Sequence, residues 1–190
     1  VGEGDDPAQS PVGVFWDLSS CALGRGLGTE GLSRSIARSA RAYGKVHAFK
    51  AYGEFRRLNQ EIRQGLHSTG AVLVDAMGDR GQGHMMALML DVLLFAVDVK
   101  PPATLVVISD AQDLSLILNR LGQRKYRLVL IHPTKRAAES VLTESADVVL
   151  DWQEVTGEEP LDPPEEEAAP GRARARGRAG SDGRGGGGFG

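Results

Sequence analysis

The sequence predicts an α/β fold, a three-layer sandwich in which helices cover both faces of a mainly parallel sheet. Short apolar runs alternate with longer helical patterns between residues 12 and 150. The apolar runs are continuous and do not alternate with polar residues, which is typical of parallel strands buried on both faces. The 190 residues, 41% of them hydrophobic, supply enough apolar material for one core.

The individual elements follow from the positions of apolar runs, capping residues and helix breakers. Thr29 is expected to cap the first helix, and Pro101-Pro102 to end the third one. A glycine-rich loop with Gly78, Gly81 and Gly83 precedes that third helix. The expected strands are 12–17, 45–52, 71–75, 104–109, 126–131 and 147–150, and the expected helices are 30–42, 54–66, 84–97, 112–121 and 135–143.

Composition divides the chain into three parts. Residues 1–10 are small, acidic and polar, and we expect a flexible lead-in; residues 11–153 form the expected folded domain. Residues 154–190 begin with a run of acids and continue with arginines among many glycines. Such low-complexity sequence cannot bury enough apolar surface to fold, so we expect a disordered tail.

Several classes of protein are excluded by simple counts. Cys21 is the only cysteine, so neither a disulfide framework nor a cysteine-based zinc cluster is available. No segment resembles a signal peptide, and the longest apolar stretch, residues 85–99, is too short and contains two acids, which argues against a membrane span. We therefore expect a cytoplasmic protein that does not enter the membrane. The chain does not begin with Met, which suggests a fragment or a processed chain.

Four acids are candidates for chemistry. Asp17 follows the first strand, and Asp110 and Asp113 follow the central strand, where parallel sheets form their sites. Asp91 lies in a helix that is apolar nearly all round, which predicts that the helix is buried and that its carboxylate is compensated. Together these carboxylates could converge on Mg²⁺ or Mn²⁺ and support phosphodiester cleavage.

Simpler roles for the same acids remain open. Asp17 could cap the next turn, Asp91 could cap a loop or pair with an arginine, and Asp110 or Asp113 could be the N-cap of the following helix. His84 lies seven residues before Asp91, but a histidine at a loop or surface position is the simpler expectation.

An ordered set of short motifs resembles the NYN domain, a branch of the PIN-like ribonuclease superfamily. The likeness is to the domains of the meiosis regulator and mRNA stability factor (limkain-b1) type, in a fungal-like single-domain version. It implies a PIN-like fold and Mg²⁺-dependent ribonuclease ancestry, with Asp17, Asp91 and Asp113 at the family's acidic positions. The motifs are Phe15-Trp16-Asp17, Phe49-Lys50-Ala51-Tyr52, the run from Leu90 to Asp98, Pro102-Ala103-Thr104, Val107-Ile108-Ser109, Arg124-Lys125-Tyr126-Arg127 and the run from Val148 to Trp152.

The site departs from the family pattern at three places. Ser20 stands where the family usually has an asparagine, and Gly83-His84-Met85-Met86 stands where it has an Asp-Lys pair. After the central strand, Ala111 replaces the leading acid of the family motif, while Asp110 occupies a glycine position and could substitute as a metal ligand. Fewer carboxylates imply weaker metal binding and weaker stabilisation of developing charge.

Two functions therefore stand side by side. The first is Mg²⁺-dependent (or Mn²⁺-dependent) hydrolysis of RNA in post-transcriptional regulation, with Asp17, Asp91 and Asp113 catalytic and Asp110 as an additional metal ligand. The alternative is a catalytically degenerate NYN domain that binds RNA or a protein. Expected partners are RNA, other proteins and a second copy of the chain; a peroxisomal association is a family-level analogy. The candidate RNA-binding residues are Arg34, Arg38, Arg41, Arg124, Lys125 and Arg127, although solvated helix faces would look the same.

Overall fold

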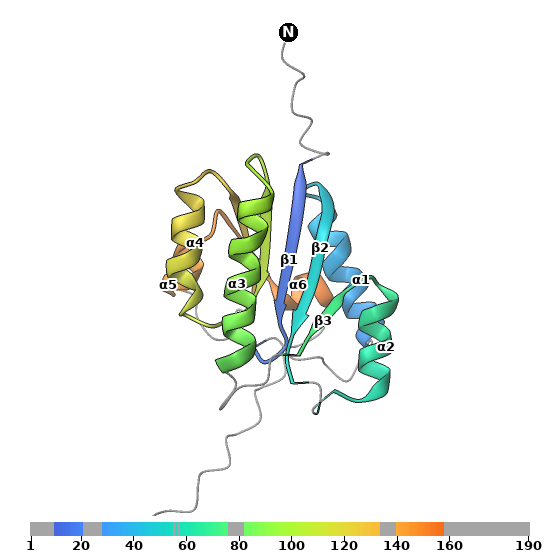
Figure 1. The fold of residues 1–190 in the computed structure, drawn as a ribbon. Coiled ribbons are helices and arrows are strands. Elements are labelled where there is room, and N and C mark those ends of the chain that lie inside the picture. The colour runs from blue at the N-terminus through green and yellow to red at the C-terminus, as the bar shows by residue number, and fades with distance from the viewer. Residues whose placement is uncertain are drawn as a thin grey trace, which may run out of the picture.

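A computed structural model shows six parallel strands in one sheet, in the order β3-β2-β1-β4-β5-β6 (Figure 1). The structure describes residues 10–20, 28–54, 56, 58–75, 82–133 and 140–157. The chain starts in the middle of the sheet, builds outward to β3, and then crosses back to β4 on the other side of β1. The point where the order reverses therefore lies between β1 and β4. The strands are β1 (Pro11–Asp17), β2 (Lys45–Tyr52), β3 (Val72–Val74), β4 (Thr104–Ile108), β5 (Arg127–His132) and β6 (Val148–Asp151).

Helices cover both faces of the sheet, and each face has its own core. Side chains of α1, α2 and α6 pack on one face, and those of α3, α4 and α5 pack on the other. Two layers of helices with a parallel sheet between them confirm the predicted three-layer α/β sandwich. The helices are α1 (Gly28–Arg41), α2 (Gln60–Ser68), α3 (Gln82–Asp98), α4 (Leu114–Gly122), α5 (Val141–Glu144) and α6 (Trp152–Thr156).

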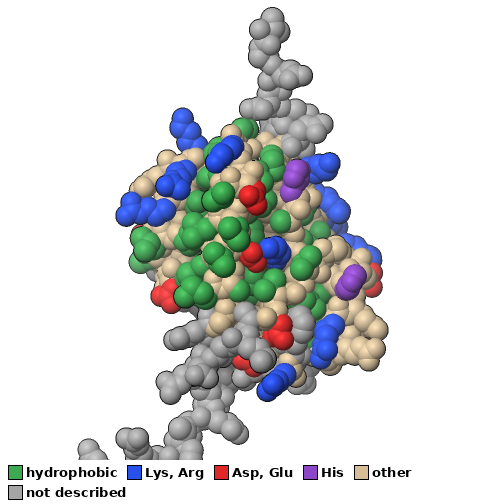
Figure 2. Space-filling model, in the orientation of Figure 1, with side chains coloured by type: hydrophobic (Ala, Val, Ile, Leu, Met, Phe, Trp, Pro, Cys, Tyr) green, Lys and Arg blue, Asp and Glu red, His purple; other side chains and the backbone are tan. Residues whose placement is uncertain are grey.

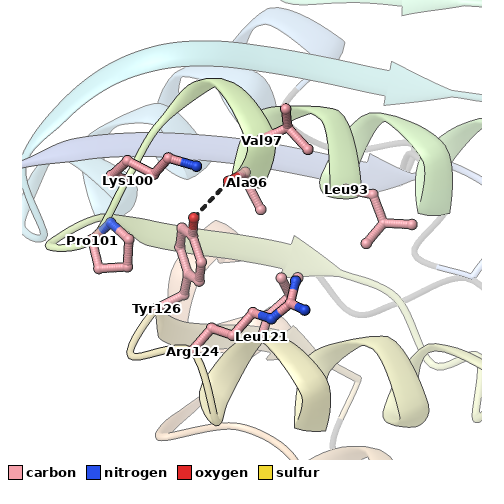
Figure 3. Close-up of a pocket in the computed structure, with 8 residues that line it drawn as sticks. All are labelled: Leu93, Ala96, Val97, Lys100, Pro101, Leu121, Arg124 and Tyr126. Carbon is pink, nitrogen blue, oxygen red and sulfur yellow. Dashed lines mark hydrogen bonds between the residues drawn. The ribbon is translucent and has the colours of Figure 1, made fainter.

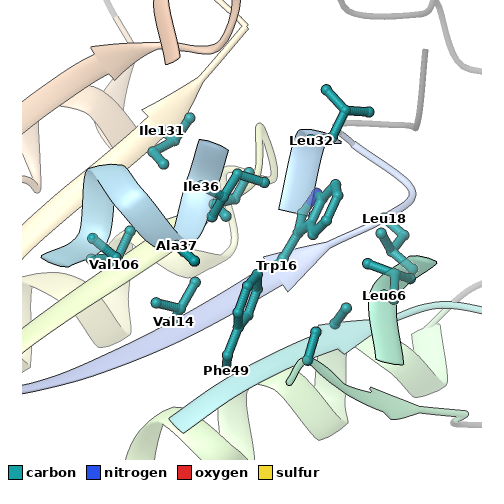
Figure 4. Packing of buried hydrophobic residues seen from close by; sticks show 14 of the residues in the cluster. Val14, Trp16, Leu18, Leu32, Ile36, Ala37, Phe49, Leu66, Val106 and Ile131 are labelled. Atoms are coloured by element: carbon teal, nitrogen blue, oxygen red, sulfur yellow. The ribbon is translucent and has the colours of Figure 1, made fainter. Parts of the chain in front are cut away.

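Alternate residues of β1 serve the two cores, because successive side chains of a strand point to opposite faces. Val14 and Trp16 join the α1 side, where Trp16 lies among Leu18, Leu32 and Leu66 (Figure 4). The ring of Phe15 joins the α3 side and meets Phe95 edge to face, with ring centroids 5.8 Å apart. The same alternation places the side chain of Asp17 on the α3 face.

The expected strands are confirmed to within one or two residues, whereas some helix boundaries were wrong. The predicted helix over 54–66 begins only at Gln60, where Asn59 is the N-cap and accepts from the Ile62 amide at 2.8 Å. Thr29 lies inside α1 and is not its cap. Of the helix predicted over 135–143, residues 135–139 lie outside the described residues, and α5 begins after a capping box at Ser140. The short helix α6 was not predicted.

The expectation that α3 is buried all round was also wrong. Leu88, Val92 and Phe95 are buried against the sheet, as the pattern required. On the opposite side of the same helix, five large apolar side chains are exposed by 45% to 69%; they are Met86, Leu90, Leu93, Leu94 and Val97. The largely apolar helix α3 is thus covered by the sheet on one side only, and no layer of described residues lies over its outer face.

Tight turns join the helices to the strands at the amino edge of the sheet, the edge where the strands begin. After α4 the amide of Tyr126 donates to the Leu121 carbonyl and that of Lys125 to the Gly122 carbonyl, with Lys125 left-handed at φ 67°. This is a Schellman turn, which commonly has glycine where Lys125 stands. After α1, Gly44 has φ 141°, and a Cβ there would lie 2.1 Å from the Ser10 carbonyl oxygen.

Candidate functional site

The carboxyl ends of β1 and β4 meet at the point where the strand order reverses. Doubly wound sheets form their ligand crevices at such points. Asp17 ends β1, and Ser109 follows β4 directly. The Ser109 hydroxyl donates to Asp17 Oδ2 at 3.0 Å, so the two strand ends are joined side chain to side chain.

Asp17 is fully buried and has its lone pairs filled by donors of the chain itself. Oδ1 accepts from the Ser19 amide at 2.9 Å and from the Ser19 hydroxyl at 2.6 Å. Oδ2 accepts from the Ser20 hydroxyl at 2.5 Å and from Ser109. A carboxylate offers about four lone-pair sites, so these four bonds use all of them.

His84 completes this cluster from the first turn of α3. It is buried, so the expectation of a loop or surface histidine was wrong. Its Nε2 lies 3.1 Å from Ser19 Oγ and 3.7 Å from Asp17 Oδ1. Because the single Ser19 hydroxyl proton is donated to Asp17, Nε2 must be the protonated nitrogen that donates to Ser19. The hydroxyl therefore does not donate to the imidazole, as a serine nucleophile would.

Asp91 is compensated by two side chains of β2. Its Oδ1 lies 2.9 Å from Lys50 Nζ, and its Oδ2 accepts from the Tyr52 hydroxyl at 2.9 Å. Burial, together with the hydrogen bond to Asp91 and its negative charge, raises the pKa of the Tyr52 hydroxyl far above its usual value. The phenol thus stays protonated and remains a donor. The expected compensation of Asp91 is present, and the cation is a lysine.

The acids after β4 have different surroundings. Asp113 occupies the N-cap position of α4, but its side chain makes no capping hydrogen bond and is exposed. Asp110 is half-buried. Asp91 lies seven residues beyond His84 on α3, which is about 10 Å along the helix axis. Asp17 and Asp91 therefore belong to separate hydrogen-bonded groups.

These arrangements do not fit a divalent ion. Within the described ranges, no group of three or more His, Cys, Asp or Glu side chains could hold a metal ion. A metal at Asp17 would have to displace serine donors, and one at Asp91 would have to bind beside the positive charge of Lys50. The side chains around Asp17 and Asp91 therefore resemble a structural hydrogen-bond network more than a metal centre.

Cations gather at the opposite, amino edge of the sheet. We define the basic edge as Arg41, Lys45, Lys100, Arg124, Lys125 and Arg127, all exposed and all at helix ends or strand starts. By contrast, acids follow the strands at the carboxyl edge; they are Glu54, Asp75, Asp110, Asp113 and Asp151. The described part of the domain thus has a basic end and an acidic end.

Contacts of Tyr43 and Tyr126 join the elements that carry the basic edge. The Arg127 guanidinium lies 4.9 Å over the ring of Tyr43, which joins β5 to the turn after α1. The Tyr126 hydroxyl donates to the carbonyls of Ala96 at 2.6 Å and Val99 at 2.9 Å, which joins the α4 turn to the end of α3. Lys100 and Arg124 line one shallow pocket of about 530 Å³ between these ends (Figure 3).

The predicted RNA-binding arginines of α1 separate into two groups. Arg34, Arg38 and Arg41 are all exposed on one side of α1. Arg41 lies at the basic edge, whereas Arg34 lies about 10 Å further from it along the axis and forms an ion pair with Glu30. Arg34 therefore contributes less free positive charge than the others.

Sequence reasoning missed the partners of both central acids. Ser19 and Ser109 each follow a strand that was predicted, so the convergence of strand ends could have indicated them. Lys50 and Tyr52 could be found only from the sheet register, in which Tyr52 lies beside Asp17. The family likeness singled out the motif that contains both residues but gave them no role.

The fold and the acids at the strand-order reversal define a PIN-like α/β domain, and comparisons with known proteins make this more specific. The sequence profile of the NYN domain matches residues 11–153, so the chain belongs to the NYN domain family. Meiosis regulator and mRNA stability factor 1 of Gallus gallus is 24% identical over 140 residues, and that of Bos taurus 22% over 151 residues.

The chain spans less than a tenth of those two relatives, 8% and 9% of their lengths, while 73% and 79% of the chain itself is covered. A crystal structure of a protein of unknown function from Vibrio parahaemolyticus has the same fold, with a TM-score of 0.59 and 17% identity. That likeness covers 77% of this chain and 95% of the other. No helix among the described residues is long and apolar enough to span a membrane.

Proposed function

We propose that this chain is an NYN domain that binds RNA without metal-dependent cleavage. The observation that carries the proposal is the state of two family acids, the fully buried Asp17 and the half-buried Asp91. Each oxygen of both carboxylates already accepts from a serine, tyrosine or lysine of the chain. The cations lie at the other end of the domain, where they outnumber the two neighbouring acids, Asp98 and Asp147, and can bind phosphates.

RNA as the ligand is supported by family and by charge. Both vertebrate relatives are named for mRNA stability. Phosphate contacts by Lys and Arg supply most of the sequence-independent affinity for nucleic acid. Tyr43 beneath Arg127 adds an aromatic ring to the same edge, although the ring is only partly exposed. The basic edge therefore has the charge to follow an RNA backbone.

Mg²⁺-dependent hydrolysis is the competing function, and it requires more rearrangement. Asp17 would have to release serine donors before it could bind a metal ion, and a metal ion at Asp91 would have to overcome the repulsion of Lys50. Asp110 and Asp113 are the more accessible acids, and two carboxylates would need phosphate oxygens of the RNA to complete a Mg²⁺ site. We therefore assign no reaction step to these residues.

Fluorescence anisotropy with a labelled single-stranded RNA, in the presence of a chelator, tests the RNA-binding surface. The variant Arg124→Gln/Lys125→Asn removes two charges, and asparagine tolerates the left-handed backbone at 125. We expect at least several-fold weaker binding and a salt slope smaller by about 0.7 for each lost phosphate contact.

The matched control is Arg34→Gln, which removes a charge already neutralised by Glu30. It should bind nearly as well as the unaltered chain. Equal losses in the two variants, or RNA binding that neither variant weakens, would show that the basic edge is not the RNA-binding surface.

A further inference from the structure

The exposed side of α3 forms a continuous apolar stripe, which we define as Met86, Leu90, Leu93, Leu94 and Val97. Figure 2 shows hydrophobic side chains gathered on the face of the molecule where α3 lies in Figure 1. All five are exposed by 45% to 69%, whereas Leu88 and Val92 on the other side are fully buried. These exposures amount to roughly 500 Å² of apolar surface, in the range of patches that mark interaction sites.

The spacing of the stripe is that of a helix-pairing seam. Met86, Leu90, Leu93 and Val97 follow each other at intervals of four, three and four residues. This is the a/d pattern in which side chains of one helix fit between those of another. The stripe has no side-chain hydrogen-bond donor, so it offers nothing to a phosphate backbone.

We propose that a second copy of this chain covers the stripe, with the two α3 helices antiparallel about a two-fold axis. Such an axis would pass between Leu90 and Leu93, so Leu90 of one copy would face Leu93 of the other. Met86 would then lie against Val97 of the other copy. The two stripes together would bury roughly 1,000 Å², about what a specific interface requires.

Charge favours the antiparallel arrangement over the parallel one. The amino end of α3 lies at the acidic carboxyl edge of the sheet, and its other end lies beside Lys100 at the basic edge. Antiparallel pairing brings the acidic end of each copy near the basic end of the other, whereas parallel pairing would bring like charges together. Asp98 of one copy would also lie near the positive amino end of the other α3.

The pocket beside the stripe offers a second place where the two copies can contact each other. Leu93 and Val97 belong both to the stripe and to the wall of the pocket, which also includes Pro101 and Leu121 (Figure 3). In the antiparallel arrangement Met86 of the other copy lies at the mouth of this pocket. A flexible methionine is well suited to fill an irregular apolar recess.

The composition of residues 158–190 is poorly suited to cover this stripe. Residues 158–190 contain only two large aliphatic or aromatic side chains, Leu161 and Phe189. These two side chains lie 28 positions apart in the sequence. Two such side chains are too few to cover a stripe of five. A second copy supplies an identical stripe on a helix of the same length, about 25 Å.

Sedimentation of the full chain at increasing concentration, up to roughly 100 µM so as to exceed a micromolar Kd, tests the proposal. We expect a dimer that Leu90→Glu dissociates, with a Kd raised roughly 100-fold or more because a charge would be buried in the seam. The control is Leu116→Glu, which places the same charge at a leucine 66% exposed on α4, outside the stripe. It should leave the dimer intact.

Disulfide trapping tests the direction of the helices independently. In a Cys21→Ser background, Met86→Cys/Val97→Cys should form covalent dimers, while Met86→Cys alone should not. The two positions lie about 16 Å apart along one helix, beyond the limit of about 7 Å between Cα atoms for a disulfide. A chain that stays monomeric at all concentrations, a dimer indifferent to Leu90→Glu, or trapping by Met86→Cys alone would overturn the proposal.

Discussion

At the scale of single residues, the partners of the candidate acids distinguish a structural role from a metal-binding one. Asp17 is buried and accepts four hydrogen bonds, three of them from serine hydroxyls. Asp91 accepts one hydrogen bond and pairs with one lysine. In a metal centre, neighbouring carboxylates repel each other until the ion binds. Here each carboxylate has hydrogen-bond or ion-pair partners from the chain itself.

Asp17→Asn should therefore destabilise the domain. The amide would place its own donors against hydroxyl and amide donors, and we expect a loss of about 2–4 kcal/mol in the free energy of unfolding. Urea denaturation measures this loss. The control is Asp113→Asn, an exposed acid without a capping bond, which should change stability by no more than about 0.5 kcal/mol. A gain in stability from Asp17→Asn would instead indicate a site of repelling acids.

Tyr52 predicts how stability depends on alkaline pH. Its pKa is raised in the folded protein, while in the unfolded chain it ionises near pH 10. The contribution of the protonated Tyr52 to the free energy of unfolding is therefore complete below about pH 10. It is lost as pH rises above this value, by up to about 1.4 kcal/mol per pH unit. Urea denaturation at several alkaline pH values should show a shallower loss for Tyr52→Phe. Parallel losses in both proteins would contradict the assigned environment of Tyr52.

The sequence indicated which residues were chemically important but not what they contact. Asp17 at a strand end and Asp91 in an apolar helix could be singled out because burial of a charge is costly wherever it occurs. Their partners depend on the register that sets Asp17 beside Tyr52, and a shift of one residue would turn Lys50 and Tyr52 to the other face. Register is a property of the whole sheet, so local sequence could not predict it.

At the scale of helices and strands, continuous apolar runs predicted the sheet well because parallel strands buried on both faces leave little ambiguity. Helix ends were less predictable. Thr29 has the right chemistry for a cap, yet α1 begins before it, and Asn59 caps α2 six residues later than expected. The outer face of α3 was mispredicted for another reason, because an apolar pattern cannot tell a fully buried helix from one whose outer apolar face is exposed.

In the turn after α4, Lys125 adds positive charge to the basic edge but has a backbone conformation that favours glycine. Lys125 occupies the left-handed position of a Schellman turn, at φ 67°, where a residue with a Cβ costs about 1 kcal/mol relative to glycine. Lys125→Gly should therefore raise the melting temperature of the domain while it weakens RNA binding. Calorimetry and anisotropy on the same preparation measure both effects. A variant that is no more stable would show that the turn is not strained.

At the scale of the whole molecule, three surfaces stand out: an acidic carboxyl edge, a basic amino edge and an apolar stripe on α3. The stripe meets the basic edge at the pocket that Leu93 and Lys100 both line. Helix ends and strand starts place Arg41, Lys100 and Arg127 at the amino edge because every strand runs in the same direction. Four residues of the basic edge were candidate RNA-binding residues in the sequence, whereas Lys45 and Lys100 were not. Their common edge could not be predicted, because it requires the strand order. The overall charge of −3 conceals this separation.

The most direct test of the account is to incubate labelled RNA with the protein in Mn²⁺ or Mg²⁺ and in a chelator, following both binding and RNA length. We predict RNA binding that does not require the metal and intact RNA in both conditions, because Asp17 and Asp91 already have partners from the chain. Asp113→Asn should behave like the unaltered protein. Cleavage that requires the metal and disappears in Asp113→Asn would contradict the account and establish a nuclease.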